Sequence, residues 1–101
     1  MLKNKINKVK KILNSAPLEL FVSNGTFEGE VNLQWDAVKD ANHYIIQVSK
    51  NKNAWQQIDI VSDAQYSVTG LKAGKTYQFR ISALHESGQS AWSSPVQKKV
   101  K

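Results

Sequence analysis

The chain has 101 residues, 41% of them hydrophobic and 22% charged, which indicates one folded domain with a modest core rather than a disordered chain. It contains no cysteine, which excludes disulfides, thiol catalysis and cysteine-based zinc sites and leaves the redox compartment undecided. The formal net charge is +6, but residues 1–15 hold five lysines and no acid and residues 98–101 hold three more lysines, so the basic charge lies in the two ends.

Residues 1–15 form a basic amphipathic arm that precedes the predicted domain. Apolar residues recur at spacings of three and four, which predicts a short basic N-terminal α-helix with one apolar stripe. A helix of this length is marginal in water, so the arm is interpreted either as a frayed tail or as a helix that docks on a protein partner, a larger assembly or an anionic surface. It lacks the apolar segment of a signal peptide, and no run in the chain approaches the roughly 18 apolar residues of a membrane span. The stripe consists of Leu2, Ile6, Val9 and Leu13, and the lysines are Lys3, Lys5, Lys8, Lys10 and Lys11.

The rest of the chain alternates between short runs of apolar and polar residues and turns. Period-two alternation predicts strands that bury one face. It places Leu18 on the same face as Leu20 and Val22, Ile58 and Ile60 inside, and Ile45 outside. The last run is broken by Pro95, which suits an edge strand or a bulge. Seven such runs predict an all-β fold, a seven-stranded antiparallel sandwich. The predicted strands are residues 18–22, 31–35, 43–49, 55–61, 66–68, 77–83 and 91–100.

Several motifs in this series resemble landmarks of the fibronectin type III family. Leu71, Gly74 and Tyr77 form an L-x-x-G-x-x-Y step into the sixth predicted strand. Trp35 ends a V-x-L-x-W run, where the family keeps a core tryptophan. The resemblance covers most of the chain, so we assign residues 16–101 to a fibronectin type III domain and treat residues 1–15 as an arm outside the family pattern.

The resemblance implies an immunoglobulin-like sandwich in which the Tyr77 hydroxyl bonds back to the upstream backbone and holds the corner between two sheets. The family includes spacer and adhesion domains, so it also implies a non-catalytic role. No Arg-Gly-Asp sequence occurs, so the best-known integrin contact of the family is not implied.

Two tryptophans outside the predicted core have alternative interpretations. Residues 89–93 resemble the W-S-x-W-S box of cytokine receptor domains with the first tryptophan missing, and alternation predicts that Arg80 points outward on the neighbouring strand. We therefore expect Arg80 to stack on Trp92 as a structural cation–π pair. Trp55 opens a strand and is expected to cover a sheet edge, and either Trp55 or Trp92 offers a stacking platform for a sugar.

Polar loop residues at one end of the predicted sandwich are the candidate binding residues, because loops on a rigid frame carry recognition. The loops after the second and sixth strands share one pole in the family topology. Their His and acidic side chains could in principle hold a metal, but polar residues gather in the loops of any sandwich, so no metal or cofactor is predicted. The candidates are Asp40, Asn42, His43, His85, Glu86, Ser87 and Gln89.

The function predicted from these features is non-catalytic, because no residue set has the spacing of a catalytic or metal centre. The chain is interpreted as a protein-interaction, adhesion or structural module, and in its sharpest form as a virion or bacterial surface decoration protein anchored by its arm. One alternative is a carbohydrate-binding accessory module. Another is a polyanion or nucleic-acid binder through the lysine-rich tails, non-specific because both tails lack arginine and aromatic residues. The resemblance favours a surface, extracellular or virion location and leaves the cytoplasm open.

Overall fold

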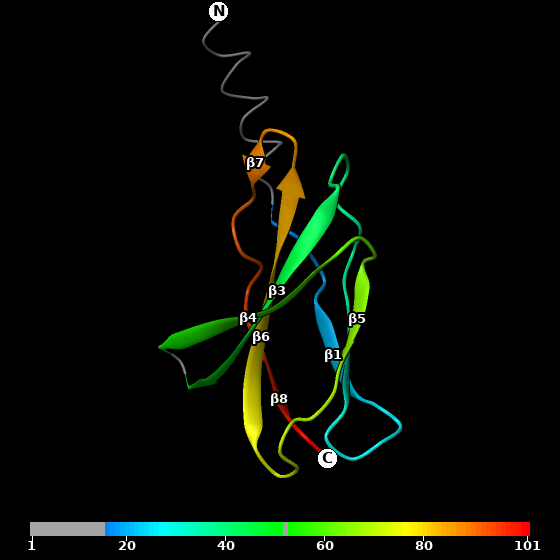
Figure 1. Cartoon of the computed structure of the whole chain (residues 1–101), viewed down its shortest axis with the longest axis vertical. Helices are drawn as coiled ribbons and strands as arrows, with labels where there is room; N and C mark the ends of the chain where they lie inside the picture. The colour runs from blue at the N-terminus through cyan, green and yellow to red at the C-terminus, as the bar shows by residue number, and fades with distance from the viewer. Residues whose placement is uncertain (1–15, 52) are drawn as a thin grey trace, which may run out of the picture.

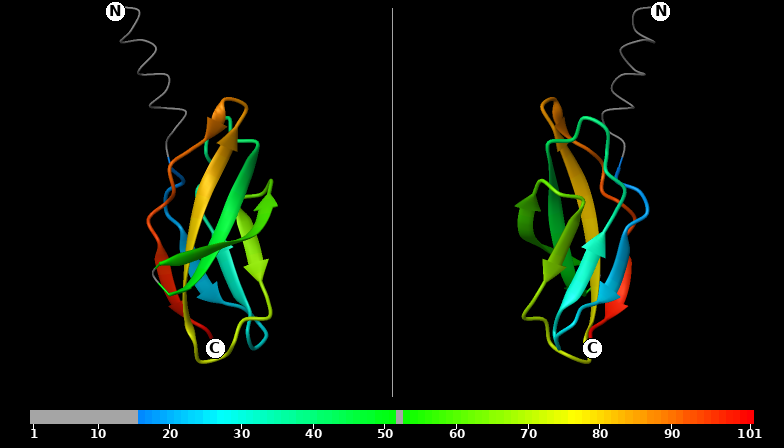
Figure 2. Two further views of the ribbon diagram at one scale, coloured as in Figure 1. Left: turned by 60° about the vertical axis from the view of Figure 1, so that its left-hand side comes forward. Right: turned by 90° about the vertical axis from the view of Figure 1, so that its right-hand side faces the viewer.

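The computed structural model describes residues 16–51 and 53–101, and these form two antiparallel β-sheets packed face to face (Figures 1 and 2). The three-stranded sheet has the order β1-β2-β5. The five-stranded sheet has the order β4-β3-β6, and both β7 and β8 pair with the far side of β6. The first sheet contains β1 (Phe21–Asn24), β2 (Val31–Gln34) and β5 (Gln65–Val68); the second contains β3 (His43–Asn51), β4 (Ala54–Val61), β6 (Thr76–His85), β7 (Gly88–Gln89) and β8 (Val96–Lys99).

The core lies between the two sheets and is built from the alternating residues of their facing strands. On β6, Phe79, Ile81 and Ala83 are fully buried, while Gln78 and Arg80, on the other face, are half-buried. Each large apolar side chain buried in this way contributes about 1.5–3 kcal/mol to folding. The other buried members of the core are Val22, Val31, Leu33, Trp35, Tyr44, Ile46, Val68, Tyr77 and Val100.

The corner before β6 has the geometry that the family resemblance implies. The backbone N–H of Lys72 donates a hydrogen bond of 3.0 Å to the hydroxyl of Tyr77, whose ring is buried. Gly74 has a φ of 86°, a left-handed conformation that glycine adopts without a steric cost. The turn is thereby tied to the strand that follows it.

The predicted count of seven strands is wrong, because the last predicted strand, 91–100, is present only as β8, and β7 is a separate two-residue strand. In the segment between them, the side chains of Ser90 and Ser93 accept hydrogen bonds from backbone N–H groups of β6. Pro95 has no N–H to offer the sheet. The regular ladder is interrupted there by serine hydroxyls, and β8 begins at Val96.

The first predicted strand, 18–22, is also misplaced. β1 begins at Phe21, and Leu18 is 68% exposed and does not share the inward face of Leu20 and Val22. The reason is Glu19, whose φ of 58° turns the backbone out of the extended conformation. Leu20, beyond that turn, packs against the core as expected.

A bulge in β4 corrects the prediction that Ile60 is buried. The register between β3 and β4 shifts at Ile58, which inserts one extra residue and reverses the alternation beyond it. Ile60 is therefore 45% exposed on the outside of the sheet, opposite Ile45. Ile45 faces outward as predicted, but it is only 8% exposed.

The loops divide between two ends of the sandwich (Figure 1). The β2–β3 loop and the β6–β7 turn lie together at the upper end, and the C-terminus lies at the opposite end. The described residues contain no helix, and therefore none that is long and apolar enough to cross a bilayer. The predicted N-terminal helix falls in residues 1–15, outside the described residues.

Candidate functional site

A cluster of Trp55, Arg80 and Trp92 lies on the outside of the five-stranded sheet, and we call it the Trp–Arg cluster. The guanidinium carbon of Arg80 lies 4.2 Å from the centroid of the Trp55 ring and 4.4 Å from that of Trp92. The predicted contact with Trp92 is therefore present. The contact with Trp55, which was expected only to cover a sheet edge, is new. Because β4 and the β7–β8 segment lie on opposite sides of β6, the two rings hold the guanidinium between them.

The strand register places each member of the cluster. Arg80 points outward because Phe79 and Ile81 fill the core, and it lies directly opposite Gln47 on β3. Its Nε–H donates a hydrogen bond of 2.8 Å to Gln47 Oε1. Partial burial lowers the pKa of the Arg80 guanidinium from its usual value, because desolvation disfavours the charge. Arginine nevertheless stays protonated at neutral pH, so the cluster carries a fixed positive charge.

The outer face of the five-stranded sheet is rich in amides and has no carboxylate among its strand residues. The acid in these strands is Asp59, and it stands opposite the core residue Ile46 and accepts a 2.9 Å hydrogen bond from the hydroxyl of Tyr66. Arg80 therefore meets no acid along the described strands of its own face. Besides the Trp–Arg cluster, this face carries His43, Ile45, Gln47, Ser49, Asn51, Gln57, Ile60, Thr76, Gln78, Ser82, Leu84, Gln89, Gln97 and Lys99.

A shallow pocket lies beside the cluster, at the end of the sheet where β3 ends and β6 begins. Ser49 pairs with Trp55 on one side and Gln78 on the other, and it is only 2% exposed. Its hydroxyl has no hydrogen-bond partner within residues 16–51 and 53–101. The pocket is lined by Ser49, Lys50, Asn51, Thr76, Gln78 and Gln97, and we call it the amide pocket.

Three buried serines hold Trp92 in place, and the sequence reasoning did not assign them this role. Ser90 Oγ accepts a 2.8 Å hydrogen bond from Ala83 N–H, and Ser93 Oγ accepts one of 3.0 Å from Ile81 N–H. Ser82 Oγ donates to the Ser90 carbonyl at 2.8 Å. The sequence feature that could have indicated this role is the Ser-x-Trp-Ser spacing. Where a strand is interrupted, serine hydroxyls on either side of a tryptophan can accept the hydrogen bonds that backbone carbonyls would otherwise accept from the neighbouring strand.

The predicted loop residues separate into two groups. The first group surrounds a shallow pocket at the upper end, where His85 Nδ1 lies 3.1 Å from the Asp40 carbonyl oxygen. His85 is 8% exposed, and its Nε2 has no partner among the described residues. His43 and Gln89 instead face outward with the Trp–Arg cluster, because both flank Leu84 in the sheet register. The pocket is lined by Asp40, Asn42, His85, Glu86 and Ser87, and a binding role for it stays a prediction.

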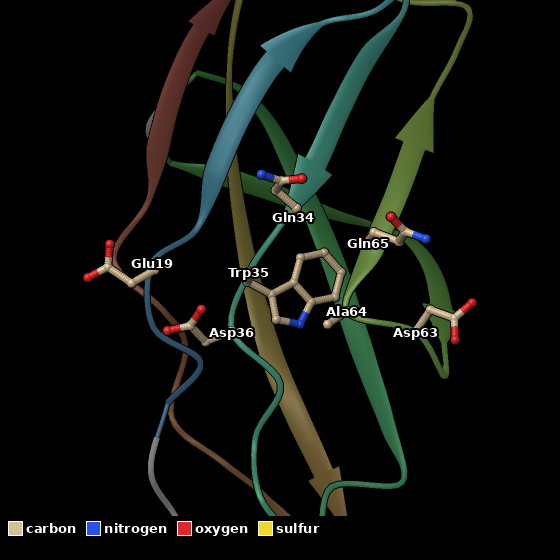
Figure 3. Close-up of a pocket in the computed structure, with 7 residues that line it drawn as sticks. All are labelled: Glu19, Gln34, Trp35, Asp36, Asp63, Ala64 and Gln65. Carbon is tan, nitrogen blue, oxygen red and sulfur yellow. The ribbon is translucent and has the colours of Figure 1, made fainter.

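Trp35 lies beneath an acidic cleft at the end of the three-stranded sheet (Figure 3). Glu19 and Asp36 lie on one side of its indole and Asp63 on the other. Trp35 is a core residue as predicted, 6% exposed, and its ring meets that of Tyr44 edge-on at 5.3 Å. Within the described ranges no three His, Cys, Asp or Glu residues come together as a metal site, in this cleft or elsewhere.

The anchoring residues of the arm lie outside the described residues, so their role stays a prediction. They are Leu2, Lys3, Lys5, Ile6, Lys8, Val9, Lys10, Lys11 and Leu13.

The strand order, the two-layer core and the tyrosine-held corner define an immunoglobulin-like β-sandwich domain. Comparison with known families agrees with this class, since the family described as "Fibronectin type III domain" matches residues 15–99. The chain belongs to the fibronectin type III domain family, whose members are typically non-catalytic.

Relatives of the chain are much longer proteins. It is 32% identical over 91 residues to "Receptor-type tyrosine-protein phosphatase F" of Danio rerio, covering 86% of this chain and 5% of the relative. It is 33% identical over 90 residues to "Protein sidekick-1" of Homo sapiens, covering 81% of this chain and 4% of that protein. The chain thus spans about one twentieth of these relatives, so the similarity concerns one domain and not their whole activities.

Solved structures share the fold at lower identity. A Fn3-like protein from Clostridium thermocellum superposes with a TM-score of 0.77 at 22% identity, covering 83% of this chain and 90% of that one. Domains A168–A170 from titin give a TM-score of 0.74 at 26% identity, covering 86% of this chain and 32% of that one. These likenesses concern the fold, and function must be argued from the surface.

Proposed function

We propose that this domain is a non-catalytic interaction module whose binding face is the outer face of the five-stranded sheet. The observation that carries the proposal is the Trp–Arg cluster. Tryptophan and arginine are the residues most enriched among those that dominate binding energy at interfaces. Here two tryptophans and one arginine stand together on the outside of the sheet, each of them half-buried.

Preorganisation supports this choice of face. Arg80 is held by two indole rings and by Gln47, and Trp92 is flanked by serines bonded to β6. Side chains that are already ordered lose little entropy when a partner binds.

We further propose that the arm, residues 1–15, attaches the domain to a larger assembly and leaves the sandwich displayed. The support is the apolar stripe with five lysines, which the sandwich core does not need. A surface location, including a virion or bacterial surface, agrees with this arrangement, and one relative is named a receptor-type protein. Removal of residues 1–14 should abolish co-purification with the assembly and leave the unfolding temperature of the sandwich nearly unchanged. Unchanged co-purification would overturn the anchoring role.

The face is tested by placing charge on it without touching the core. Gln57 and Gln97 are exposed on the outer face, and Gln34 and Gln65 are exposed on the three-stranded sheet. The double variant Gln57→Glu, Gln97→Glu should lose partners captured from an extract of the cells that produce the protein. The matched double variant Gln34→Glu, Gln65→Glu should retain them. Equal capture by both variants would overturn the proposed face, as would loss limited to the control.

A further inference from the structure

The chemistry of the binding face indicates what kind of ligand it takes. We propose that the Trp–Arg cluster and the amide pocket form a binding site for an acidic saccharide, whose carboxylate or sulfate group pairs with the edge of the Arg80 guanidinium. This inference rests on the proposed function, because it names the ligand class of the same face.

The stacking of Arg80 leaves one part of its side chain available. The guanidinium carbon lies over both indole rings, 4.2 Å and 4.4 Å from their centroids, and Nε–H is engaged by Gln47. A guanidinium has five N–H donors, and the remaining four lie in its plane. They have no acceptor within the part of the chain that the structure describes. A guanidinium held in this way presents its in-plane fork to a carboxylate or sulfate, which can accept two parallel hydrogen bonds.

The charges around Arg80 select an anion. The described strands of this sheet carry no carboxylate on the outer face, since Asp59 points toward Tyr66. Arg80 therefore has no acidic partner in the described residues, although the body of the domain contains eight acids. Partial burial between the rings also reduces screening by water and strengthens a charge pair there. An anionic group meets attraction and no local repulsion on this face.

The amide pocket supplies the hydrogen bonds that the hydroxyl groups of a saccharide require. Gln78 precedes Arg80 by two residues on the same face of β6, a separation of roughly 7 Å. Because Gln78 lines the pocket, a saccharide whose acid group pairs with Arg80 places the adjoining part of its chain beside the pocket. Amide and hydroxyl side chains there both donate and accept. The hydroxyl of Ser49 is buried at the pocket without a partner among the described residues, which leaves one donor unassigned.

An acidic peptide is the competing ligand for a lone arginine, but the surroundings favour a saccharide. The outer face offers exposed glutamines and half-buried indole rings, and amides and aromatic rings suit the hydroxyl groups and C–H faces of sugars. Its exposed apolar surface is small, with Ile60 as the large exposed apolar residue among the described face residues. Apart from Trp55 and Trp92, a peptide ligand would find few apolar anchors among the described residues of this face.

Calorimetric titration of the folded full-length chain at physiological salt tests the inference. The probes are maltohexaose, sulfated maltohexaose, a hyaluronan hexasaccharide and hexaglutamate. The sulfated and the carboxylated saccharide distinguish the two anion sources, and at least one of them should bind while maltohexaose does not. Arg80→Gln and Arg80→Lys should each weaken binding roughly tenfold or more. Glutamine loses both the charge and the fork of N–H donors, and lysine keeps the charge but loses the fork. Gln97→Ala, on an exposed edge position, should weaken binding less and should not affect folding.

Control variants separate this site from general attraction to polyanions. Lys39→Gln removes one charge from the exposed β2–β3 loop, outside the strands of the binding face, and should leave affinity unchanged. Replacing the five arm lysines with glutamine should also leave it unchanged. Equal loss in the arm variant and Arg80→Gln would overturn the site, as would binding of maltohexaose with equal affinity. Preference for hexaglutamate, or no binding of any probe, would overturn the proposal that the ligand is an acidic saccharide. In that case, loss of partner capture in the Gln57→Glu, Gln97→Glu variant would still support the proposed binding face.

Discussion

The hydroxyl of Tyr77 accepts a hydrogen bond of 3.0 Å from the backbone N–H of Lys72, which closes the turn before β6. Because the Tyr77 ring is buried, no water easily replaces the hydroxyl. We expect Tyr77→Phe to lower the free energy of unfolding by about 1–3 kcal/mol, the cost of leaving a partly buried N–H without a partner. Urea unfolding followed by tryptophan fluorescence measures this difference. A variant as stable as the wild type would show that the turn does not depend on this bond.

Ser90 should be a stability residue although it is polar. Its hydroxyl accepts from Ala83 N–H at 2.8 Å in place of a backbone carbonyl, and the residue is 5% exposed. Ser90→Ala leaves that buried N–H unpaired, so we expect a loss of about 1–3 kcal/mol in thermal or urea unfolding. Ser94→Ala, at an exposed neighbouring position, is the matched control and should change stability by less than about 0.5 kcal/mol. Equal effects would contradict the role assigned to the serines.

Two glycines should respond differently to the same substitution. Gly29 and Gly70 have φ values of 79° and 76°, so alanine is strained at both. At Gly29 an added Cβ would also lie 2.6 Å from the Leu71 carbonyl oxygen, whereas at Gly70 it meets nothing within 4 Å. We expect Gly70→Ala to cost about 1–2 kcal/mol and Gly29→Ala to cost more. Equal unfolding midpoints for the two variants would show that the Leu71 backbone moves away at little cost.

Alkaline pH should weaken the link between the two sheets at Tyr66. Desolvation and the 2.9 Å hydrogen bond to Asp59 raise the pKa of the Tyr66 hydroxyl above its ordinary value of 10.0. The folded state therefore holds this proton more tightly than the unfolded state. The stabilisation is complete below pH 10 and is lost as the pH rises through the folded-state pKa.

The measurement for this prediction is the unfolding free energy between pH 9 and pH 12, compared with that of Tyr66→Phe, which has no proton to lose. The wild type should lose its advantage over the variant as the pH rises. A constant difference across that range would contradict the assignment.

Much of the fold was predictable because period-two alternation and the Leu71, Gly74 and Tyr77 spacing are local features of the sequence. The errors fall where one residue changes the backbone or the register. The left-handed φ of Glu19 displaced the first strand, and the bulge at Ile58 turned Ile60 outward. Both depend on tertiary contacts between neighbouring segments, which alternation alone does not encode.

The candidate site was predictable only in part. The Arg80–Trp92 contact followed from two residues on strands expected to be neighbours. Trp55 reaches Arg80 from β4, with β3 lying between β4 and β6. This contact depends on the register of the three strands, which the spacing of residues in the sequence does not give. The absence of carboxylates from the described strands of the outer face likewise depends on which way each strand faces. The bulge determines that direction for the end of β4.

Nuclear magnetic resonance titration tests the central claim most directly, namely that the outer face of the five-stranded sheet is the binding face. Proton–nitrogen spectra of the full-length chain report the Arg80 Nε–H and the indole N–H groups of Trp55 and Trp92 separately. With the acidic hexasaccharide that binds in calorimetry, or with the captured partner, these three signals should shift most, together with the backbone of Gln78. Largest shifts at Asp40, Asn42 and Glu86, or in the lysine-rich ends alone, would contradict the account.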